Sequence, residues 1–350
     1  MRATFVYPNS RRDLLAGIEQ GEEPDSTLHG ALCLGEHGID VRFHDPLLTR
    51  RTLPPPLDRV TWTLRELTTP YELGRTDVVF TPLAALLPLA ARGRRLPVVA
   101  INFGLNLIWR RASRARRMLL RSSLRAAARV ICLGESQRSE LVASAGLDPV
   151  RVVTLPIPVD SQFFRPRSEP AEDGGGVLTV GKDLARDYGT FLDAVRPLAV
   201  DATVVAHPRN LEGQELPPNA AVRSGLSFTE LRELYARAAC VVLPQRREEY
   251  VYGSEGGGLT ALLEAMAMGR PIVASNRAIL HDYVSDGVEA LLVPPEDATA
   301  LRAAIDRVLG DPELARSLGA AARARVESSH TSRGFAARLA PLLRSVVAGG

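Results

Sequence analysis

The sequence predicts an α/β protein made of two similar halves, each with a parallel sheet covered by helices. Short runs of β-branched residues alternate with helical stretches along the chain, which is the pattern of βαβ units. The alternation stops once, at a segment rich in proline, glycine and charge, and then restarts. The length of 350 residues also exceeds that of one ordinary domain.

The first half contains β-branched runs that are typical of buried strands, beginning with ATFVY at residues 3–7. Helices are expected between several of them, notably at residues 26–37 and 113–128. Parallel strands joined by helices imply a sheet with helices on both faces. The other strands are expected at residues 40–43, 77–80, 97–101, 129–133 and 151–155.

The second half follows RPRSEPAEDGGG at residues 165–176, which is typical of a linker. From Asp297 onward the chain is helical almost throughout, and Asp311 and Pro312 open one of these helices. Two such halves place a cleft between them, and ligands of parallel sheets bind outside the carboxyl ends of the strands. The strands are expected at 177–180, 202–206, 240–243, 271–274 and 290–293, and helices at 189–199, 229–239 and 258–268.

Composition describes a soluble globular protein, with 45% hydrophobic and 24% charged residues. No apolar stretch is long enough to span a membrane, and MRATFVYPNSRRD at the start does not resemble a signal peptide. Cys33, Cys132 and Cys240 lack the close spacing of a metal site or disulfide framework. We therefore expect a cytoplasmic protein with core thiols and no metal.

Glu264 lies inside a helix that is apolar on nearly every side, in EGGGLTALLEAMAMGRPIVAS at residues 255–275. A buried carboxylate needs a partner, and this one has no cationic neighbour on its own helix. Glycines before the helix allow a ligand to approach the free N–H groups at its start. Glu264 therefore either binds ribose hydroxyls of a nucleotide or pairs with an arginine from elsewhere in the fold.

Lys182 is the only lysine of the chain and lies in a second motif, VLTVGKDLARDYGTFLDAV at residues 177–195. This segment predicts a strand, a glycine turn and a helix, with Arg186 on the other side of the turn. Cations in such a turn can bind phosphate oxygens of a ligand. The alternative is a solvated turn.

These segments together resemble the retaining glycosyltransferases of family 4, which have the two-domain GT-B fold. The resemblance covers most of the chain and rests on the order and spacing of four motifs. It implies two Rossmann-like domains facing each other across a cleft: an acceptor domain at 1–168, a donor domain at 169–332, and a helix at 333–350 packing toward the first. The motifs are RVICLGESQRSELVASAGLDPVRVVTLPIPVDSQFFRP (129–166), LSFTELRELYARAACVVLPQ (226–245), EGGGLTALLEAMAMGRPIVAS (255–275) and VSDGVEALLVPPEDATALRAAIDRVL (284–309).

The resemblance also implies how a nucleotide-diphosphate sugar is held, with a UDP-sugar or a GDP-sugar as the expected donor. Lys182 and Arg186 would bind the diphosphate, and Glu264 the ribose. No metal or other cofactor is implied, because the cations and the helix N-terminus neutralise the leaving diphosphate. The glycine turn and the start of the donor-site helix complete the expected diphosphate site with Gly181, Gly257, Gly258 and Leu259.

The sequence departs from the family pattern at two places. The family has seven residues between its two glutamates, whereas eight separate Glu255 from Glu264. We expect Glu255 to serve near the transferred sugar, with Glu248 and Glu249 as weaker alternatives. The histidine often found after the fourth or fifth strand of the first domain is replaced by Thr81 or Asn102. Transfer on one face, in which the departing phosphate helps to deprotonate the acceptor, does not require that histidine.

Two histidines are further site candidates. His207 follows the strand at 202–206 and is expected to contact phosphate or sugar as a catalytic residue. His29 lies beside the loop that would face the acceptor, and Asn102 is expected on the same acceptor side. The acceptor itself stays open between a glycan, a lipid-linked molecule and a small molecule.

The segment RRASRARRMLLRSSLRAAAR at residues 110–129 predicts a helix with a basic face. From residue 78 to 134 there is no Asp or Glu, while eleven arginines occur. The helix is interpreted either as a solvated helix packed on the sheet or as a contact with anionic lipids on the inner face of the membrane. No aromatic platform accompanies the charge, so we do not expect nucleic acid as a partner. The basic face is expected to carry Arg110, Arg114, Arg117, Arg121 and Arg125, with apolar contacts from Met118, Leu119, Leu120 and Leu124.

Other functions remain as alternatives. A Rossmann oxidoreductase would need G-x-G-x-x-G after the first strand, and FVYPNSRRD does not supply it. A sugar-nucleotide epimerase on the same fold is one alternative. A non-catalytic protein that binds nucleotide sugars is another, because the glutamate spacing and the missing histidine depart from the family pattern.

Overall fold

The structure is a computed structural model that describes every residue except 46–57, 83, 167–174, 251 and 350. The chain divides into two compact units. The first unit contains Met1–Glu19, Leu28–Pro156 and Arg333–Gly350, and the second contains Gln20–Thr27 and Ile157–Ser332. The predicted boundary after residue 168 lies outside the described residues, whereas the units divide at Pro156 and Ile157.

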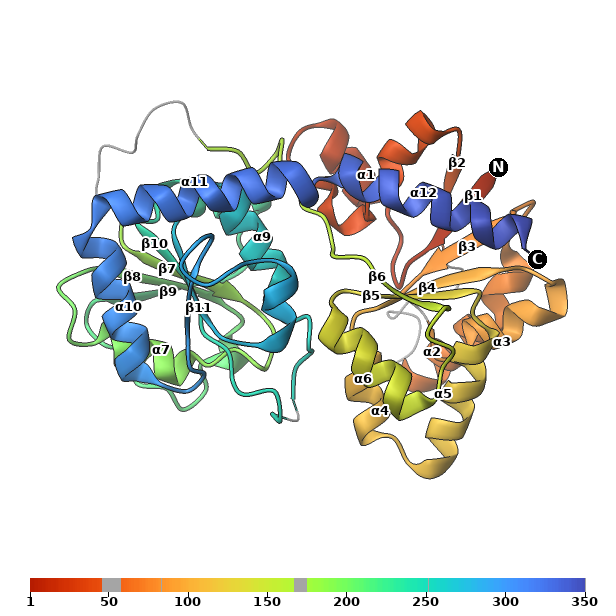
Figure 1. The fold of residues 1–350 in the computed structure, drawn as a ribbon, viewed down its shortest axis with the longest axis horizontal. Coiled ribbons are helices and arrows are strands. Elements are labelled where there is room, and N and C mark those ends of the chain that lie inside the picture. Colours follow the sequence, from red (N-terminus) through yellow and green to blue (C-terminus); the bar gives the residue numbers. More distant parts are fainter. Residues whose placement is uncertain (46–57, 83, 167–174, 251, 350) are drawn as a thin grey trace. The chain divides into compact units, whose positions relative to one another are not determined.

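The first unit is built on a six-stranded parallel sheet with the order β2-β1-β3-β4-β5-β6 (Figure 1). All six strands coincide with runs expected from the sequence. Residues of β3, β4 and β5 are fully or almost fully buried, except Arg129 at the start of β5, which matches their apolar sequences. The strands are β1 (Arg2–Val6), β2 (Asp40–His44), β3 (Val78–Thr81), β4 (Val98–Asn102), β5 (Arg129–Cys132) and β6 (Val152–Thr154).

Helices cover both faces of this sheet, with α2 to α6 on one side and α12 on the other (Figure 1). The helix expected at 113–128 is confirmed as α5, which Ser113 caps by accepting a hydrogen bond from the Arg116 N–H. Phe335 and Leu339 of α12 are fully buried. The helices are α1 (Arg12–Glu19), α2 (Asp58–Glu72), α3 (Leu87–Ala91), α4 (Leu105–Arg111), α5 (Arg114–Ala126), α6 (Glu135–Ala145) and α12 (Ser332–Ala348).

The α-helix expected at 26–37 is wrong. The structure has two short 3-10 segments there, Asp25–Leu28 and Ala31–His37. His29 and Gly30 lie between them with φ angles of 53° and 68°, and this left-handed pair interrupts any continuous helix.

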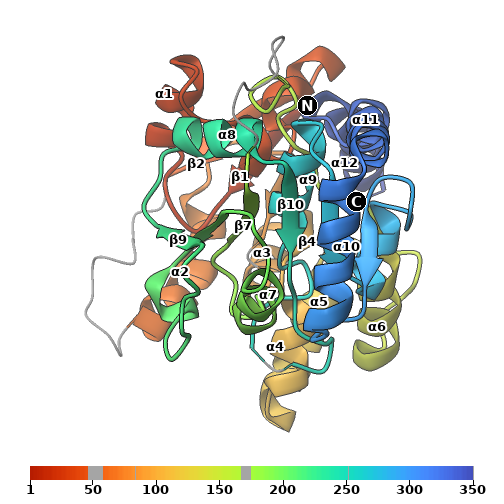
Figure 2. The same cartoon turned by 90° about the vertical axis from the view of Figure 1, so that its left-hand side faces the viewer.

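The second unit has its own six-stranded parallel sheet, with the order β12-β11-β10-β7-β8-β9. In chain order this is the doubly wound arrangement of a Rossmann fold, in which the direction of winding reverses between β7 and β10. Strand β9 is the one strand of this sheet that the sequence did not predict; Figure 2 shows it beyond β7, toward the edge of the sheet. The strands are β7 (Val177–Gly181), β8 (Ala202–Ala206), β9 (Ala220–Arg223), β10 (Cys240–Leu243), β11 (Ile272–Ser275) and β12 (Leu291–Val293).

The core of this unit forms where helices α7 and α10 pack on one face of the sheet (Figures 1 and 2). Phe191 of α7 and Ile305 of α10 are fully buried there, and burying each such side chain contributes about 1.5–3 kcal/mol. Helix α9 is buried along nearly its whole length and packs against α11. The helices are α7 (Tyr188–Val195), α8 (Phe228–Arg237), α9 (Leu259–Ala267), α10 (Ala298–Gly310) and α11 (Pro312–Ser329).

Candidate functional site

The candidate site lies at the carboxyl ends of β7 and β10, where the winding of the second sheet reverses. Strand β7 ends at Gly181 and continues into the turn that carries Lys182. Helix α7 begins after Asp187, whose side chain accepts a hydrogen bond from the Thr190 N–H. The chain after β10 reaches Gln245 and then the glycine loop before α9. The two predicted motifs therefore meet at one edge of one sheet.

Asp183 connects the glycine turn to the glycine loop. One carboxylate oxygen accepts a hydrogen bond from the Ala185 N–H at 2.8 Å, and the other accepts one from the Ser254 N–H at 3.1 Å. A Cβ added at Gly257 would lie 2.8 Å from the Asp183 carboxyl carbon, and one at Gly253 would collide with Asp183. Glycine at both positions lets the loop close onto the turn.

Arg186 is enclosed by this arrangement and is only 5% exposed. A Cβ at Gly181 would collide with its Nε atom, and one at Gly258 would lie 3.3 Å from its Nη1 atom. Both Nε and Nη1 are buried without a hydrogen-bond partner among the described residues. A buried nitrogen without a hydrogen-bond partner is unfavourable, so these two atoms keep a hydrogen-bonding capacity that the described residues do not fill.

Glu264 has a partner that sequence reasoning missed. The Tyr235 hydroxyl donates a hydrogen bond of 2.9 Å to its Oε2 atom, and the carboxylate is only 4% exposed. Burial raises the pKa of Glu264 to about 7, against the lowering effects of the Tyr235 hydrogen bond and the Arg186 charge. Glu264 and Arg186 therefore lie within electrostatic reach of each other. No local pattern in the sequence around Tyr235 pointed to this contact.

Lys182 and His207 lie on neighbouring strand ends, because Gly181 of β7 pairs with Ala206 of β8. Both side chains are exposed. The Nδ1 atom of His207 accepts a hydrogen bond of 3.2 Å from the Arg209 N–H, and the Arg209 guanidinium donates to the Lys182 carbonyl at 3.4 Å. Two cationic residues, Lys182 and Arg209, therefore lie at this edge of the second unit.

The glycine loop itself is held by local hydrogen bonds. The Gly257 N–H donates to the Ser254 carbonyl at 3.0 Å, and the Leu259 N–H donates to the Gly256 carbonyl at 3.2 Å. These two N–H groups, expected to bind diphosphate, are therefore engaged within the loop in this structure. Glu255 is half-buried in the same loop.

The weaker candidates Glu248 and Glu249 lie outside that loop. The Glu248 carboxylate accepts a hydrogen bond of 2.6 Å from the Ala278 N–H, and Glu249 is exposed.

The two acceptor-side candidates lie inside the first unit. Asn102 is fully buried, and its side-chain oxygen accepts hydrogen bonds from the N–H groups of Gly104 and Leu105 at the start of α4. His29 is buried within a cluster of aromatic rings and lies 3.1 Å from the Tyr7 hydroxyl through Nδ1. Burial, and then the charge of Arg11, lowers the pKa of His29 to about 3. Both side chains make contacts within the first unit. A direct contact of either one with an acceptor stays a prediction.

The basic helix expected over residues 110–129 is not continuous, because α4 ends at Arg111 and α5 begins at Arg114, so Arg110 lies on α4. Leu120 and Leu124 are buried, but Met118 is 70% exposed and Leu119 is 46% exposed. Several arginines of the expected basic face bind protein groups instead of remaining solvated. Arg110 pairs with Glu140 at 2.6 Å, Arg117 donates to the Trp109 carbonyl at 2.9 Å, Arg121 lies over the Trp109 ring, and Arg125 donates to the Gly146 carbonyl at 3.0 Å.

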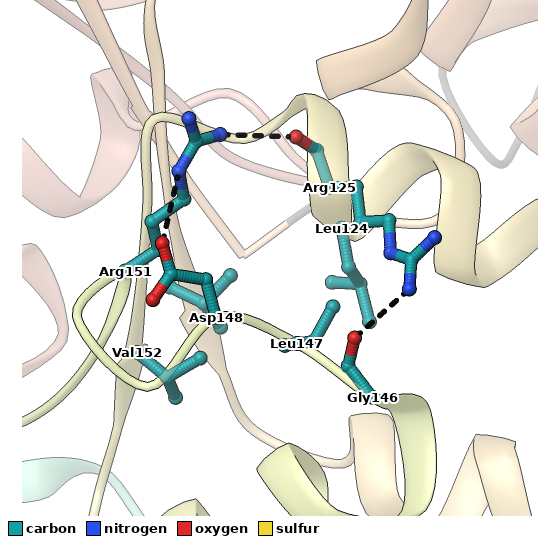
Figure 3. A pocket seen from close by; sticks show the side chains of 8 residues that line it. Leu124, Arg125, Gly146, Leu147, Asp148, Arg151 and Val152 are labelled. Carbon is teal, nitrogen blue, oxygen red and sulfur yellow. Dashed lines mark hydrogen bonds and ion pairs between the residues drawn. The ribbon is translucent and has the colours of Figure 1, made fainter.

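A pocket of about 410 Å³ lies at the amino ends of β5 and β6 (Figure 3). Its floor is apolar, and its rim carries Arg125 and Arg151. The Arg151 guanidinium donates to the Arg125 carbonyl at 3.3 Å and lies 3.9 Å from the Asp148 carboxylate. The pocket is at the opposite edge of the sheet from the carboxyl ends, so it is separate from the predicted site residues of the first unit.

Two expectations concern metals and membranes. Within the part of the chain that the structure describes, no group of three or more His, Cys, Asp or Glu side chains could hold a metal ion. Among the described residues, no helix combines the length and apolar character needed to cross a bilayer.

Comparison with known proteins identifies the family. A model described as "Glycosyltransferase Family 4" matches residues 20–163, and one described as "Glycosyl transferases group 1" matches residues 210–325. The chain belongs to the group 1 glycosyltransferases. The second match covers the glycine loop, Glu264 and Tyr235. The resemblance to glycosyltransferase family 4 is confirmed by the two matches, while retention of configuration stays a prediction.

Solved glycosyltransferase structures confirm the GT-B fold of this family member. A sucrose-phosphate synthase from Thermosynechococcus elongatus has a TM-score of 0.76 at 19% identity, covering 100% of both chains. Anabaena HepE in complex with UDP and glucose has a TM-score of 0.71 at 15% identity, covering 98% of this chain and 99% of that chain.

Curated relatives of this group 1 glycosyltransferase include two enzymes with different names. An MMP alpha-(1->4)-mannosyltransferase from Mycolicibacterium hassiacum is 28% identical, over 74% of this chain and 61% of the relative. A D-inositol 3-phosphate glycosyltransferase from Frankia alni is 30% identical, over 59% of this chain and 57% of the relative. The chain thus spans about 60% of the length of these relatives.

Proposed function

We propose that this chain transfers a sugar from a nucleotide-diphosphate sugar to an acceptor hydroxyl, with retention of anomeric configuration and without a metal ion. The observation that carries the proposal is Arg186, whose Nε and Nη1 atoms are buried between Gly181 and Gly258 without a hydrogen-bond partner among the described residues. A diphosphate supplies the charge and the acceptor oxygens that this guanidinium lacks. The neighbouring N-terminus of α9 favours the same anion.

Lys182 provides a second cation at the same edge of the sheet. Its side chain is exposed, so it can follow a phosphate that approaches from solvent. Two cations and a helix N-terminus together can stabilise the negative charge that develops on the leaving diphosphate. This is the physical basis for proposing transfer without a metal ion.

Glu264 is proposed to accept hydrogen bonds from the ribose hydroxyls. The Tyr235 hydroxyl occupies Oε2 and fixes the orientation of the carboxylate, while the nearby charge of Arg186 favours its ionised form. A carboxylate accepts up to about four hydrogen bonds, so the Tyr235 contact does not exhaust it.

The proposed transfer takes place on one face of the donor sugar. The bond between the anomeric carbon and the diphosphate oxygen breaks, and a bond from the acceptor oxygen to the same carbon forms on the same face. The acceptor proton passes to the departing phosphate oxygen. Glu255 and His207 are proposed to position the sugar and its phosphate during this step.

The donor base is proposed to be uracil or guanine. A fold neighbour has been solved with UDP and glucose, which supports a UDP-sugar. The acceptor is proposed to be a glycan, a lipid-linked molecule or a small molecule, and one relative is named for an inositol phosphate acceptor.

The test uses labelled UDP- and GDP-sugars with the purified chain in excess chelator. The proposal expects the release of nucleoside diphosphate to depend on an acceptor, with the configuration of the product retained. Nucleotide binding without any turnover would favour the non-catalytic alternative. Interconversion of the donor sugar without transfer would favour the epimerase.

A contact between α5 and the anionic inner face of the cytoplasmic membrane is a further proposal. It is supported by the exposed apolar side chains of Met118 and Leu119, which are flanked by the exposed Arg114 and Arg116. Apolar side chains that insert and basic side chains that meet headgroups are the two components of interfacial binding.

A further inference from the structure

Arg11 lies in the first unit where the strand order of the sheet predicts a ligand site. The first sheet has the order β2-β1-β3-β4-β5-β6, so its winding reverses between β1 and β3. In parallel sheets, ligands bind outside the carboxyl ends of the strands at such a reversal. Strand β1 ends at Val6, and Arg11 closes the short loop between this strand and α1.

The guanidinium of Arg11 is half-buried, and no ion pair joins it to a carboxylate whose side chain the structure describes. It lies 4.1 Å from the centroid of the Tyr7 ring. Its Nε atom is buried without a hydrogen-bond partner, and no carboxylate of the described residues forms an ion pair with it. Burial lowers the pKa of Arg11, which shows that its surroundings oppose the charge.

Two arginines near Arg11 have partners for their guanidinium groups. The exposed Arg12 forms an ion pair with Asp45. The buried Arg65 donates to the carbonyl oxygens of Tyr7 and Pro8, and the charges of Glu72 and Glu66 support it. Among the described side chains, Arg11 has neither kind of partner, although it directly precedes Arg12 in the chain.

The support beneath Arg11 is rigid. The Tyr7 ring is almost fully buried, stacks against His29 at a centroid distance of 5.9 Å, and hydrogen-bonds to that histidine through its hydroxyl. Arg65 holds the backbone of the loop through the Tyr7 and Pro8 carbonyls. A cation that is held in place before a ligand arrives loses little freedom on binding.

We propose that Arg11 binds a phosphate ester on the acceptor, so that this glycosyltransferase prefers acceptors that carry phosphate. That the bound phosphate belongs to an acceptor rests on the proposed function. The anion site at Arg11 is inferred from the geometry alone. Arginine pairs with phosphate oxygens through two parallel hydrogen bonds, which suits a guanidinium whose Nε atom has no hydrogen-bond partner among the described residues. The phosphate ester can belong to a soluble sugar phosphate or to a lipid headgroup.

The experiment measures binding to the full chain with saturating UDP present, so that Arg186 and Lys182 are occupied. The probes are glucose and glucose 6-phosphate in solution, and vesicles of phosphatidylinositol or of phosphatidylcholine. The variants are Arg11→Gln and Arg11→Lys, with Arg12→Gln as the control because Arg12 already has a carboxylate partner. Donor and acceptor KM values are measured in the same series.

We expect glucose 6-phosphate or phosphatidylinositol to bind, and their uncharged counterparts not to bind. Arg11→Gln weakens that binding about ten-fold or more, Arg11→Lys retains part of it, and Arg12→Gln leaves it unchanged. The proposal is overturned if neither phosphate probe binds, if Arg11→Gln binds as the wild type does, or if Arg11→Gln raises the donor KM and leaves the acceptor unaffected. Phosphate binding at Arg11 without sugar transfer from any donor would instead refute the proposed function and leave the anion site standing.

Discussion

The Tyr235 hydroxyl donates a 2.9 Å hydrogen bond to Glu264 inside the second unit, and both side chains are almost completely shielded from solvent. The bond joins α8 to α9, two helices separated along the chain by a strand and the glycine loop. Arg186 adds an attractive charge on the same carboxylate. These contacts are compatible with a structural role and with a ligand-binding role for Glu264. Experiments can separate the two roles.

The pH dependence of stability reports on Glu264. Its pKa is about 7 in the folded protein and ordinarily 4.5, so between these values the folded state holds a proton that the unfolded state releases. The contribution of Glu264 to the free energy of unfolding is thus fully present below about pH 4.5 and is lost as the pH rises through 7. Urea unfolding at pH 5 and pH 8 should show a smaller pH effect in Glu264→Gln than in the wild type. An equal pH effect in both proteins would show that Glu264 does not titrate in this range.

Donor affinity should depend on the charge of Glu264. Glu264→Gln keeps the size of the side chain and loses the charge-assisted bonds to the ribose, each about 1.5–3 kcal/mol. Calorimetric titration with UDP or GDP should show affinity at least ten-fold weaker, with little change in the melting temperature of the unliganded protein. Tyr235→Phe is the matched control, because it removes the internal bond and keeps the carboxylate. Normal nucleotide binding with a much lower melting temperature would make Glu264 a purely structural residue.

Arg186→Met should uncouple stability from binding. The substitution replaces a buried guanidinium, whose Nε and Nη1 atoms lack hydrogen-bond partners among the described residues, with an apolar side chain of similar length. Below the Glu264 pKa of about 7, where that carboxyl is largely neutral, the unliganded protein should therefore be at least as stable as the wild type. The same variant should lose most of the thermal stabilisation by UDP in chelator. Arg209→Met, at an exposed arginine on the same edge, is the control and should retain it. Strong destabilisation of Arg186→Met without ligand would show that the guanidinium holds the fold together.

Gly181→Ala tests the enclosure of Arg186. Its Cβ would collide with the Arg186 Nε atom, so the guanidinium must move away from the glycine loop. We expect nucleotide binding to weaken about ten-fold or more, measured by calorimetry, while the unit stays folded. Gly74→Ala is the control, because no atom lies within 4 Å of the Cβ it would add. Unchanged binding in Gly181→Ala would mean that the observed position of Arg186 is not needed.

Helix α5 should bind anionic vesicles through the exposed residues of its N-terminal half. Met118→Ser combined with Leu119→Ser removes the inserting side chains, and Arg114→Gln combined with Arg116→Gln removes the exposed charges. Co-sedimentation with phosphatidylglycerol vesicles should fall in both variants and decline steeply as salt rises in the wild type. Val150→Ser, at another exposed apolar residue of the first unit, should bind normally. Equal binding to neutral vesicles would leave α5 as a solvated helix.

The sequence predicted the two sheets well because their buried strands are continuous β-branched runs. Strand β9 was not predicted because Ala220–Arg223 is largely exposed and its sequence, AAVR, lacks that pattern. The prediction of a helix at 26–37 was wrong because the residue types of this segment favour a helix. They do not reveal the left-handed backbone of His29 and Gly30.

The candidate site was predictable in part for a similar reason. Glycines mark the places where backbone and side chains approach closely, and Gly181 and Gly258 do surround Arg186. The contact between Tyr235 and Glu264 depends on how two helices pack, and no local pattern encodes that packing.

The first unit is assembled from stretches that are distant in the chain, and its last one, Arg333–Gly350, follows the whole of the second unit. Helix α12 supplies the fully buried side chains of Phe335, Leu339 and Leu343, and Phe335 lies against His29 at a centroid distance of 6.3 Å. A ribosome that has made residues 1–156 has therefore not yet made the wall that encloses His29. The second unit, by contrast, has nearly all of its residues in one uninterrupted stretch and can fold as soon as that stretch emerges. The first unit is consequently completed only after the second unit has been synthesised.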